Sequence, residues 1–256
     1  MKVLVLGGSL AGLSAAMLLT RSGHDVTVIE RDEPAPADKT GALNAWARPS
    51  TPQLHHSHVL VSGGVQVLRA ELPDVFSDLV DHGANLISLF DYLPPGITDR
   101  EARDGVEQIQ SMCVRRPVID WALNRAADRS GLQVLRTMAR GLAIEGRRVT
   151  GVVTDAGLHP ADVVIDASGR RSRVPRWLAD QAIIAGESRS PCGCVYVTRA
   201  YALHGKPPPA PLMAGFGTAL PAEGLVALVF RADDDAFTLS LSLHVDDKQM
   251  LITREA

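Results

Sequence analysis

A glycine-rich turn near the N-terminus carries the strongest chemical signal in this sequence. Gly7 and Gly12 occupy the first and third glycine positions of the G-x-G-x-x-G fingerprint, and Ser9 stands at the second. The first glycine allows a tight turn, the small second residue lets backbone approach a pyrophosphate, and the third lets a helix pack closely on a sheet. N–H groups at the start of that helix then face the phosphates. The turn therefore predicts a dinucleotide site built from Gly7, Gly8, Ser9, Leu10, Ala11 and Gly12.

An acidic residue completes the fingerprint. Glu30 follows Gly12 by 18 residues and ends the apolar run Val26–Ile29, where a carboxylate can hold ribose hydroxyls. A carboxylate there would repel the 2′-phosphate of NADP, and Arg31 beside it offsets part of that charge. FAD or NAD is therefore expected at this turn. The alternative is an ordinary glycine-rich turn in which Glu30 is a solvated strand end.

These residues need a strand, a helix and a second strand to position them, and the hydrophobic pattern indicates all three. Val3–Leu6 is a continuous apolar run, whereas Leu10, Leu13 and Met17 recur at helical spacing. A second apolar run then ends at Glu30. This order is a βαβ unit, so we expect an α/β fold that opens with a Rossmann-like domain.

The same N-terminal stretch imitates a secretory signal peptide, because Lys2 precedes an apolar region. Gly7, Gly8 and Ser9 would interrupt the helix of such a peptide, and the apolar spacing changes from strand to helix across them. No later segment approaches the roughly 18 apolar residues that a membrane span needs. We therefore expect a soluble, cytoplasmic protein with no membrane partner.

Composition narrows the class of protein further. The chain has 256 residues, of which 46% are hydrophobic and 21% charged, and its formal net charge is -3. These values exclude disorder, collagen and coiled coil, and they give no reason to expect a nucleic acid as partner. Three cysteines, Cys113, Cys192 and Cys194, cannot form a fully paired disulfide framework. We expect small buried or half-buried thiols, since no nearby histidine or second cysteine pair supports a metal site.

The rest of the chain alternates helices with strands and ends in a sheet. Residues 32–52 are expected to form a long loop without a helix. We expect a dinucleotide-binding domain over residues 1–190 and a partial antiparallel sheet over 191–256, with Asp233, Asp234 and Asp235 in a solvated turn. One helix is expected over 61–73, a second from there to about residue 82, and a third over 118–129. Strands are expected over 86–90, 111–114, 132–136, 148–154, 162–165, 194–203, 225–230 and 237–245.

Four features of the sequence are informative when they are taken together. They are the Gly7–Gly12 turn with Glu30 and Arg31, the run from Arg48 through His58, Arg116 with Pro117, and the run from Asp162 through Ser172. In combination these segments resemble the FAD-dependent monooxygenases of the aromatic hydroxylase superfamily, the group A flavoproteins. The resemblance continues into Tyr196–Arg199, and more narrowly the chain is similar to the polyene epoxidases of polyether biosynthesis. The resemblance implies an FAD-binding domain over residues 1–190 followed by a partial substrate-domain sheet over 191–256.

The resemblance implies roles for residues outside the turn. Arg48 and Arg116 would contact the phosphate and ribityl region of the flavin, because a guanidinium donates two hydrogen bonds to phosphate. A solvated loop cation and a helix-end charge are the respective alternatives. Asp166 and Gly169 would help to hold the cofactor from the end of their strand, whereas Asp162 would only begin that strand.

Three histidines lie close together in the second of these segments. His55, His56 and His58 could form a metal site, but no Asp, Glu or Cys lies nearby in sequence. The adjoining Pro-Gln pair matches the flavoprotein pattern instead. We therefore expect flavin-proximal or structural histidines and no metal.

The reaction that the resemblance implies is oxygen transfer. NAD(P)H would reduce FAD transiently, and the reduced flavin would use O₂ to hydroxylate or epoxidise a small hydrophobic substrate of secondary metabolism. The flavin supplies the chemistry and the protein supplies orientation and exclusion of water, so no catalytic residue is expected from the chain. A flavin-dependent reductase of prenyl double bonds is an alternative. A halogenase is disfavoured, because the chain has no lysine between Lys39 and Lys206 and no Trp-x-Trp motif.

A third motif of this family, a Gly-Asp pair followed by His and Pro, is absent. The sequence contains no Gly-Asp dipeptide and reaches Ala256 within the expected substrate-domain sheet. The chain is therefore expected to be a truncated or split member, or a catalytically empty remnant that binds a nucleotide or a partner. An open sheet edge would favour self-association or a partner that supplies the missing C-terminal portion.

Overall fold

The computed structural model describes residues 1–88, 90, 93, 96–99, 101, 104–105, 109–205, 217–222 and 225–246, and the chain divides into two compact units. Unit 1 contains residues 1–52 and 120–189, and unit 2 contains residues 53–119 and 190–256. The break after residue 189 is close to residue 191, where we placed the start of a second domain, and the domain bounds themselves stay a prediction. Residues 53–119, expected within the first domain, group with the C-terminal sheet instead.

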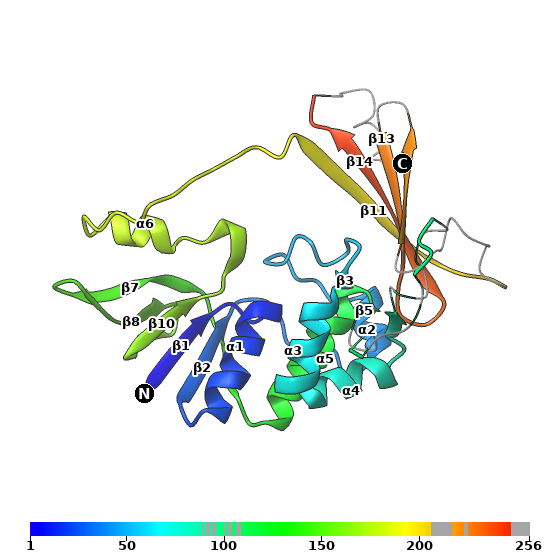
Figure 1. The fold of residues 1–256 in the computed structure, drawn as a ribbon. Helices are drawn as coiled ribbons and strands as arrows, with labels where there is room; N and C mark the ends of the chain where they lie inside the picture. Colours follow the sequence, from blue (N-terminus) through cyan, green and yellow to red (C-terminus); the bar gives the residue numbers. More distant parts are fainter. Residues whose placement is uncertain are drawn as a thin grey trace. The chain divides into compact units, whose positions relative to one another are not determined.

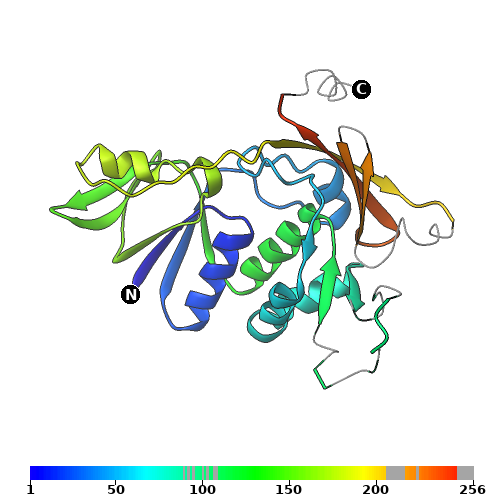
Figure 2. The ribbon, with the colours of Figure 1, turned by 45° about the horizontal axis from the view of Figure 1, so that its top comes forward.

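Unit 1 is built on a parallel sheet of four strands (Figure 1). Its elements are β1 (Lys2–Leu6), α1 (Leu10–Arg21), β2 (Asp25–Glu30), β6 (Gln133–Arg136) and β10 (Val163–Asp166). The strand order is β10-β1-β2-β6, and β1 and β2 are almost wholly buried, which explains the continuous apolar run of β1. Helix α1 connects β1 to β2 and packs on both (Figure 2), so the predicted βαβ unit is confirmed.

A second sheet in unit 1 shares its core with the first. Its antiparallel strands are β7 (Ala139–Glu145), β8 (Arg148–Thr154) and β9 (Gly157–Pro160), and helix α6 (Val174–Ala179) follows β10. Leu4, Leu6 and Ile29 of the parallel sheet pack with Val152 of β8, and Trp177 of α6 packs against this group. The shared core fixes the ends of β1 and β2, where the glycine turn begins.

Unit 2 contains an antiparallel sheet of the predicted kind. Its order is β11-β14-β13-β12, and a second antiparallel sheet has the order β3-β5-β4. The expected strand over 86–90 ends at Ser88, and Leu89 lies outside the described residues. The elements are β3 (Val59–Leu60), α3 (Ser62–Glu71), α4 (Pro73–Asp81), β4 (Asn85–Ser88), β5 (Gln110–Cys113), β11 (Cys194–Ala202), β12 (Gly217–Ala222), β13 (Leu225–Arg231) and β14 (Ala236–His244).

Of two further helices, α5 was expected over 118–129 and begins two residues earlier, whereas α2 was not expected. Helix α5 (Arg116–Arg129) has Pro117 in its first turn, where a missing N–H leaves no intrahelical bond unmade. Helix α2 (Lys39–Asn44) lies in the segment 32–52, so the expectation of an uninterrupted loop there is wrong. The Asp38 side chain caps α2 by accepting a hydrogen bond from Gly41 N–H at 2.7 Å, and Ala42 is fully buried. A local cap and tertiary burial therefore stabilise a helix whose sequence has little periodicity.

The turn between β13 and β14 is solvated at Asp234 and Asp235, as expected, but not at Asp233. Asp233 is fully buried, and its Oδ1 accepts hydrogen bonds from Arg115 N–H at 2.8 Å and Arg115 Nε at 2.9 Å. Its Oδ2 accepts one from Arg115 Nη2 at 2.5 Å, and Asp234 N–H donates to the Gly83 carbonyl at 2.9 Å. Burial alone would lower the pKa of Arg115, but the hydrogen bonds and charge of Asp233 raise it above its ordinary value. Only Asp234 and Asp235 are exposed.

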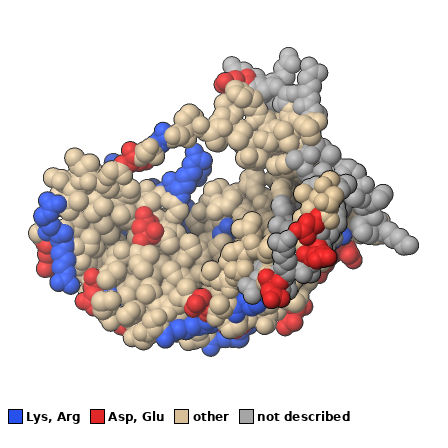
Figure 3. Space-filling model, in the orientation of Figure 1, with Lys and Arg blue, Asp and Glu red and all other residues tan. Residues whose placement is uncertain are grey.

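The surface and the cysteines bear on the remaining expectations. Acidic and basic side chains are interspersed on the face drawn in Figure 3, as the small net charge leads one to expect. Cys113 is buried and Cys194 half-buried as expected, whereas Cys192, which precedes β11, is exposed. In the part of the chain that the structure describes, no helix has the length and apolar character to cross a bilayer.

Candidate functional site

The turn after β1 requires glycine at two positions. Gly7 has a φ of +101°, and a Cβ there would lie 2.6 Å from the carbonyl oxygen of Ala167. A Cβ on Gly12 would lie 1.8 Å from the carbonyl oxygen of Gly7. Both obstructing atoms belong to backbone and cannot rotate away. Helix α1 therefore approaches the turn as closely as the fingerprint predicts.

The N-terminus of α1 presents backbone donors at this turn. Ser9 is the N-cap, but its hydroxyl donates to Asp120 Oδ1 at 2.9 Å rather than capping the helix. The first hydrogen bond of the helix runs from Leu13 N–H to the Ser9 carbonyl at 2.9 Å. The N–H groups of residues 10–12 consequently have no partner inside the helix. Together with the helix dipole, they form a site suited to an anion.

Glu30 lies against the turn and is 3% exposed. Its Oε2 accepts hydrogen bonds from Gly8 N–H at 2.7 Å and from Arg48 Nη2 at 2.8 Å. Its Oε1 accepts one from Asp32 N–H at 2.8 Å. The alternative of a solvated strand end is therefore wrong. The carboxylate holds the conformation of the turn, and Oε1 retains a lone pair for a further donor.

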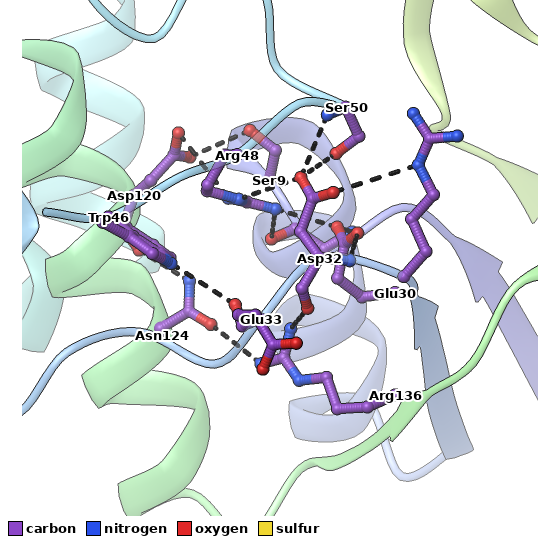
Figure 4. A network of polar contacts seen from close by, with 12 residues as sticks. Ser9, Glu30, Asp32, Glu33, Trp46, Arg48, Ser50, Asp120, Asn124 and Arg136 are labelled. Atoms are coloured by element: carbon purple, nitrogen blue, oxygen red, sulfur yellow. Dashed lines mark hydrogen bonds and ion pairs between the residues drawn. The ribbon is translucent and has the colours of Figure 1, made fainter.

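Arg48 stands at the centre of a buried charge cluster (Figure 4). Besides Glu30, its Nη2 donates to the Gly8 carbonyl at 3.1 Å. Its Nε lies 3.6 Å from Asp32 Oδ2, and its Nη1 lies 3.8 Å from Asp120 Oδ2. The alternative of a solvated loop cation is therefore wrong. Arg48 acts here as the counter-charge that holds Glu30 in place.

The charges of this cluster are not evenly matched. Glu30, Asp32 and Asp120 are all buried around one central guanidinium, whose Nε and Nη1 make no hydrogen bond within the described residues. Arg136 adds a second positive charge and donates to the Asp32 carbonyl at 3.1 Å. Burial lowers the pKa of Arg136, the charge of Glu30 opposes that shift, and the charge of Arg48 adds to it. Removing Arg48 would leave the buried carboxylates of Glu30, Asp32 and Asp120 without their central counter-charge.

A cavity of about 350 Å³ lies at the carboxyl ends of the parallel strands. This is the place where open α/β sheets bind their ligands, and the volume is in the range of small-molecule sites. Three guanidinium groups border it, those of Arg31, Arg171 and Arg173, against the single carboxylate of Glu30. Further lining residues are Leu6, Gly7, Gly8, Ser9, Ile29, Ser50, Thr51, Thr137, Met138, Ala139, Ala167, Ser168 and Trp177.

Asp166 acts on the wall of this cavity through its own turn. Its Oδ1 accepts hydrogen bonds from Ser168 N–H at 3.1 Å and from the Ser168 hydroxyl at 2.5 Å. Its Oδ2 accepts one from the Ser172 hydroxyl at 2.5 Å. Gly169 follows with a φ of +80° and is exposed. The structure thus shows Asp166 holding the segment that contributes Ser168, and its direct contact with a cofactor stays a prediction.

Arg116 belongs to unit 2, whereas the other predicted site residues belong to unit 1. Its side chain is buried, with Nη1 3.3 Å from His58 Nε2, so it is more than a solvated helix-end charge. Asp162, which we expected only to begin a strand, precedes β10, and its Oδ2 accepts a hydrogen bond from Lys2 N–H at 2.8 Å. The role expected for Arg116 at the flavin stays a prediction.

Several residues of the site were missed by sequence reasoning. Asp32 and Asp120 complete the buried cluster, and Thr137, Arg171 and Arg173 line the cavity. One signal could have identified Thr137, because it follows directly on β6, and ligands collect where parallel strands end. The burial of Asp120 has no comparable signal, since its partner Ser9 lies 111 residues away.

These features fit FAD. The N–H groups at the start of α1, a helix whose Gly12 packs directly on the Gly7 carbonyl, suit a pyrophosphate. The open lone pair of Glu30 Oε1 suits a ribose hydroxyl. Arg31, Arg171 and Arg173 supply positive charge around the same cavity.

Comparison with known proteins agrees with this assignment. Residues 2–91 match the family described as DAO, FAD dependent oxidoreductase. Protein Rv3254 of Mycobacterium tuberculosis is 31% identical over 193 residues, which cover 68% of this chain and 39% of that protein. The D-amino acid dehydrogenase of Bradyrhizobium diazoefficiens is 38% identical over 85 residues, covering 29% of this chain and 20% of the dehydrogenase. The chain thus spans about two fifths or less of these curated relatives.

Solved structures of flavoproteins share the fold. PqsL of Pseudomonas aeruginosa, described as "a probable FAD-dependent monooxygenase", aligns with a TM-score of 0.71 and 18% identity over 99% of this chain and 63% of its own. The flavin-dependent brominase Bmp2 aligns with a TM-score of 0.66 and 18% identity over 96% of this chain and 57% of its own. The predicted fold class, an α/β fold with a Rossmann-like domain and an antiparallel sheet at the C-terminal end, is therefore confirmed.

Proposed function

We propose that this chain binds FAD through unit 1 and acts in a monooxygenase that hydroxylates or epoxidises a small hydrophobic substrate. The observation that carries the FAD site is the cavity at the strand ends, which Gly7, Gly8 and Glu30 line together and where the Glu30 carboxylate binds the Gly8 N–H. The match of residues 2–91 to FAD dependent oxidoreductases supports it independently.

Each group at the cavity has a defined task in this proposal. The N–H groups of Leu10, Ala11 and Gly12 hold the pyrophosphate, and Glu30 Oε1 accepts a hydrogen bond from a ribose hydroxyl. Arg48 holds the Glu30 carboxylate in place and is not among the residues that line the cavity. When bound, FAD supplies the redox chemistry, accepting electrons from NAD(P)H and passing them to O₂.

The finer assignment rests on two lines of support. The four sequence segments resemble group A monooxygenases, with polyene epoxidases of polyether biosynthesis as the more specific likeness, and the fold is that of PqsL. Under this proposal the chain works in the cytoplasm in secondary metabolism and has no nucleic acid or membrane partner.

A titration tests the proposal. The purified chain should quench FAD fluorescence on binding, and NAD(P)H oxidation should then depend on O₂. Hydrogen peroxide release without substrate oxidation would mark uncoupled turnover, which water reaching the flavin produces. Turnover of a prenyl double bond without O₂ would point to a reductase, and no quenching at any FAD concentration would refute the FAD site.

A further inference from the structure

A chain of hydroxyl groups crosses one face of the β11–β14 sheet in unit 2. Thr198 of β11 stands opposite Ser240 of β14, and Thr238 lies two residues earlier on the same face. The Thr198 and Ser240 hydroxyls are 2.7 Å apart, and Ser57 bridges Ser240 and Thr238 at 2.7 Å each. His56 closes the series with its Nδ1 2.9 Å from the Thr198 hydroxyl.

The loop that carries His56 is held in one conformation. His58 places its Nδ1 3.0 Å from the His56 carbonyl and its Nε2 3.3 Å from Arg116 Nη1. A guanidinium only donates, so His58 Nε2 is the acceptor and its Nδ1–H donates to the carbonyl. His56 is therefore held at two points, by the hydrogen bond of His58 to its backbone carbonyl and by the contact of its ring Nδ1 with the Thr198 hydroxyl.

Counting hydrogens decides the tautomer of His56. The four hydroxyls of Thr198, Ser240, Ser57 and Thr238 hold four hydrogens, and the series has four contacts. If each hydroxyl donates toward His56, every contact is filled and Nδ1 is the acceptor. If His56 Nδ1–H donates instead, five hydrogens share four contacts and one is left without an acceptor among the described residues. Thr238 and Ser240 are each 3% exposed, so a hydroxyl hydrogen without an acceptor there would destabilise the folded protein.

The hydrogen of the neutral His56 ring is therefore on Nε2. This atom has no hydrogen-bond partner among the described residues, and it is not one of their buried unpartnered atoms. His56 is half-buried, so Nε2 remains accessible to a ligand. The hydroxyl series thus orients an N–H donor that nothing in the described protein uses.

We propose that His56 is the recognition residue of a ligand site in unit 2 and donates its Nε2–H to a carboxylate or carbonyl oxygen of a small organic molecule. A fixed N–H donor selects an acceptor oxygen and gives nothing to a ligand that only donates, such as an ammonium group. Thr198 is the positioning residue, because its hydroxyl binds Nδ1 of the His56 ring. The proposal concerns unit 2 and does not depend on flavin binding.

NMR of the full chain labelled with ¹⁵N-histidine tests this directly. Long-range ¹H–¹⁵N correlations should show His56 as the Nε2–H tautomer, with its signal identified by its loss in His56→Asn. Benzoate, the probe, should shift the His56 Nε2 signal and leave that of His55, an exposed neighbour, unchanged. Benzylammonium should shift neither. A His56 Nδ1–H tautomer, or no response of His56 to benzoate, would overturn the proposal.

Matched variants separate recognition from folding. His56→Gln can place an amide donor near the Nε2 position, whereas His56→Asn places one only near Nδ1. We expect benzoate affinity to fall about fivefold or more in His56→Asn, the loss of one hydrogen bond, and to be largely kept in His56→Gln. His55→Asn should bind benzoate like the wild type. Equal affinity in His56→Asn and the wild type, at unchanged melting temperature, would also overturn the proposal.

Discussion

Replacing Gly12 by alanine is the sharpest test of the glycine turn. The added Cβ would lie 1.8 Å from the Gly7 carbonyl oxygen and 2.9 Å from the Gly7 carbonyl carbon. Ordinary contact begins near 3.4 Å, so turn and helix would have to separate by about 1.6 Å. Because backbone obstructs the methyl group, no rotamer change can relieve the clash.

The expected effect follows from this displacement. Overpacking a rigid site costs about 1–3 kcal/mol, and we expect the upper end here because two backbone segments must move. The N–H groups of residues 10–12 would move with α1 away from the pyrophosphate. Gly12→Ala should therefore lose about 3 kcal/mol of unfolding free energy and bind FAD at least about tenfold more weakly.

Urea unfolding and FAD fluorescence quenching measure the two effects. Gly64→Ala in α3 is the matched control, since a Cβ there would meet only Leu60 Cβ at 4.0 Å. That variant should be neutral or stabilised by up to about 1 kcal/mol and should bind FAD normally. If Gly12→Ala matched the wild type in both stability and FAD affinity, the close packing of α1 against the glycine turn would be refuted.

Three further outcomes are expected. Glu30→Gln turns one acceptor into a donor that faces other donors, so it should lower the unfolding free energy measured in urea by about 3 kcal/mol and weaken FAD binding. An unchanged midpoint of urea unfolding would contradict the buried cluster. Asp233→Asn should lose about 3 kcal/mol of unfolding free energy, because it removes a fully buried charge from its arginine partner. Asp235→Asn on the same turn should change the unfolding free energy by less than about 0.5 kcal/mol. Similar losses in both variants would count against the buried pair. Burial raises the pKa of Cys113 to about 12, so near pH 8 a thiol reagent should modify Cys192 readily and reach Cys113 only after unfolding; rapid modification of Cys113 in the native protein would contradict this.

The start of unit 1 could be predicted from sequence because its signals are local. The apolar run of β1 and the spacing of Gly7, Ser9 and Gly12 are properties of neighbouring residues, and each constrains the backbone directly. Glu30 belongs to the same short unit. The turn, the helix and the acid could therefore be placed correctly without knowledge of any long-range contact.

Charge burial could not be predicted in the same way. Arg48 and Asp233 have the composition of solvated surface residues, yet each is buried against a partner of opposite charge. The partner of Asp233 is Arg115, 118 residues earlier in the chain. Sequence reasoning assigned solvent to Asp233 because an acidic turn is usually exposed, and tertiary pairing overrode that preference.

The division between sequence and structure follows from the range of the forces involved. Backbone conformation at Gly7 and the helical spacing of α1 depend on sterics within a few residues, so the sequence alone determined them. The cavity wall at Thr137 and Arg171, and the tautomer of His56, depend on which strands pair and which hydroxyls meet. Desolvation and hydrogen-bond satisfaction act only once distant segments are packed together, so only the tertiary structure decided these features.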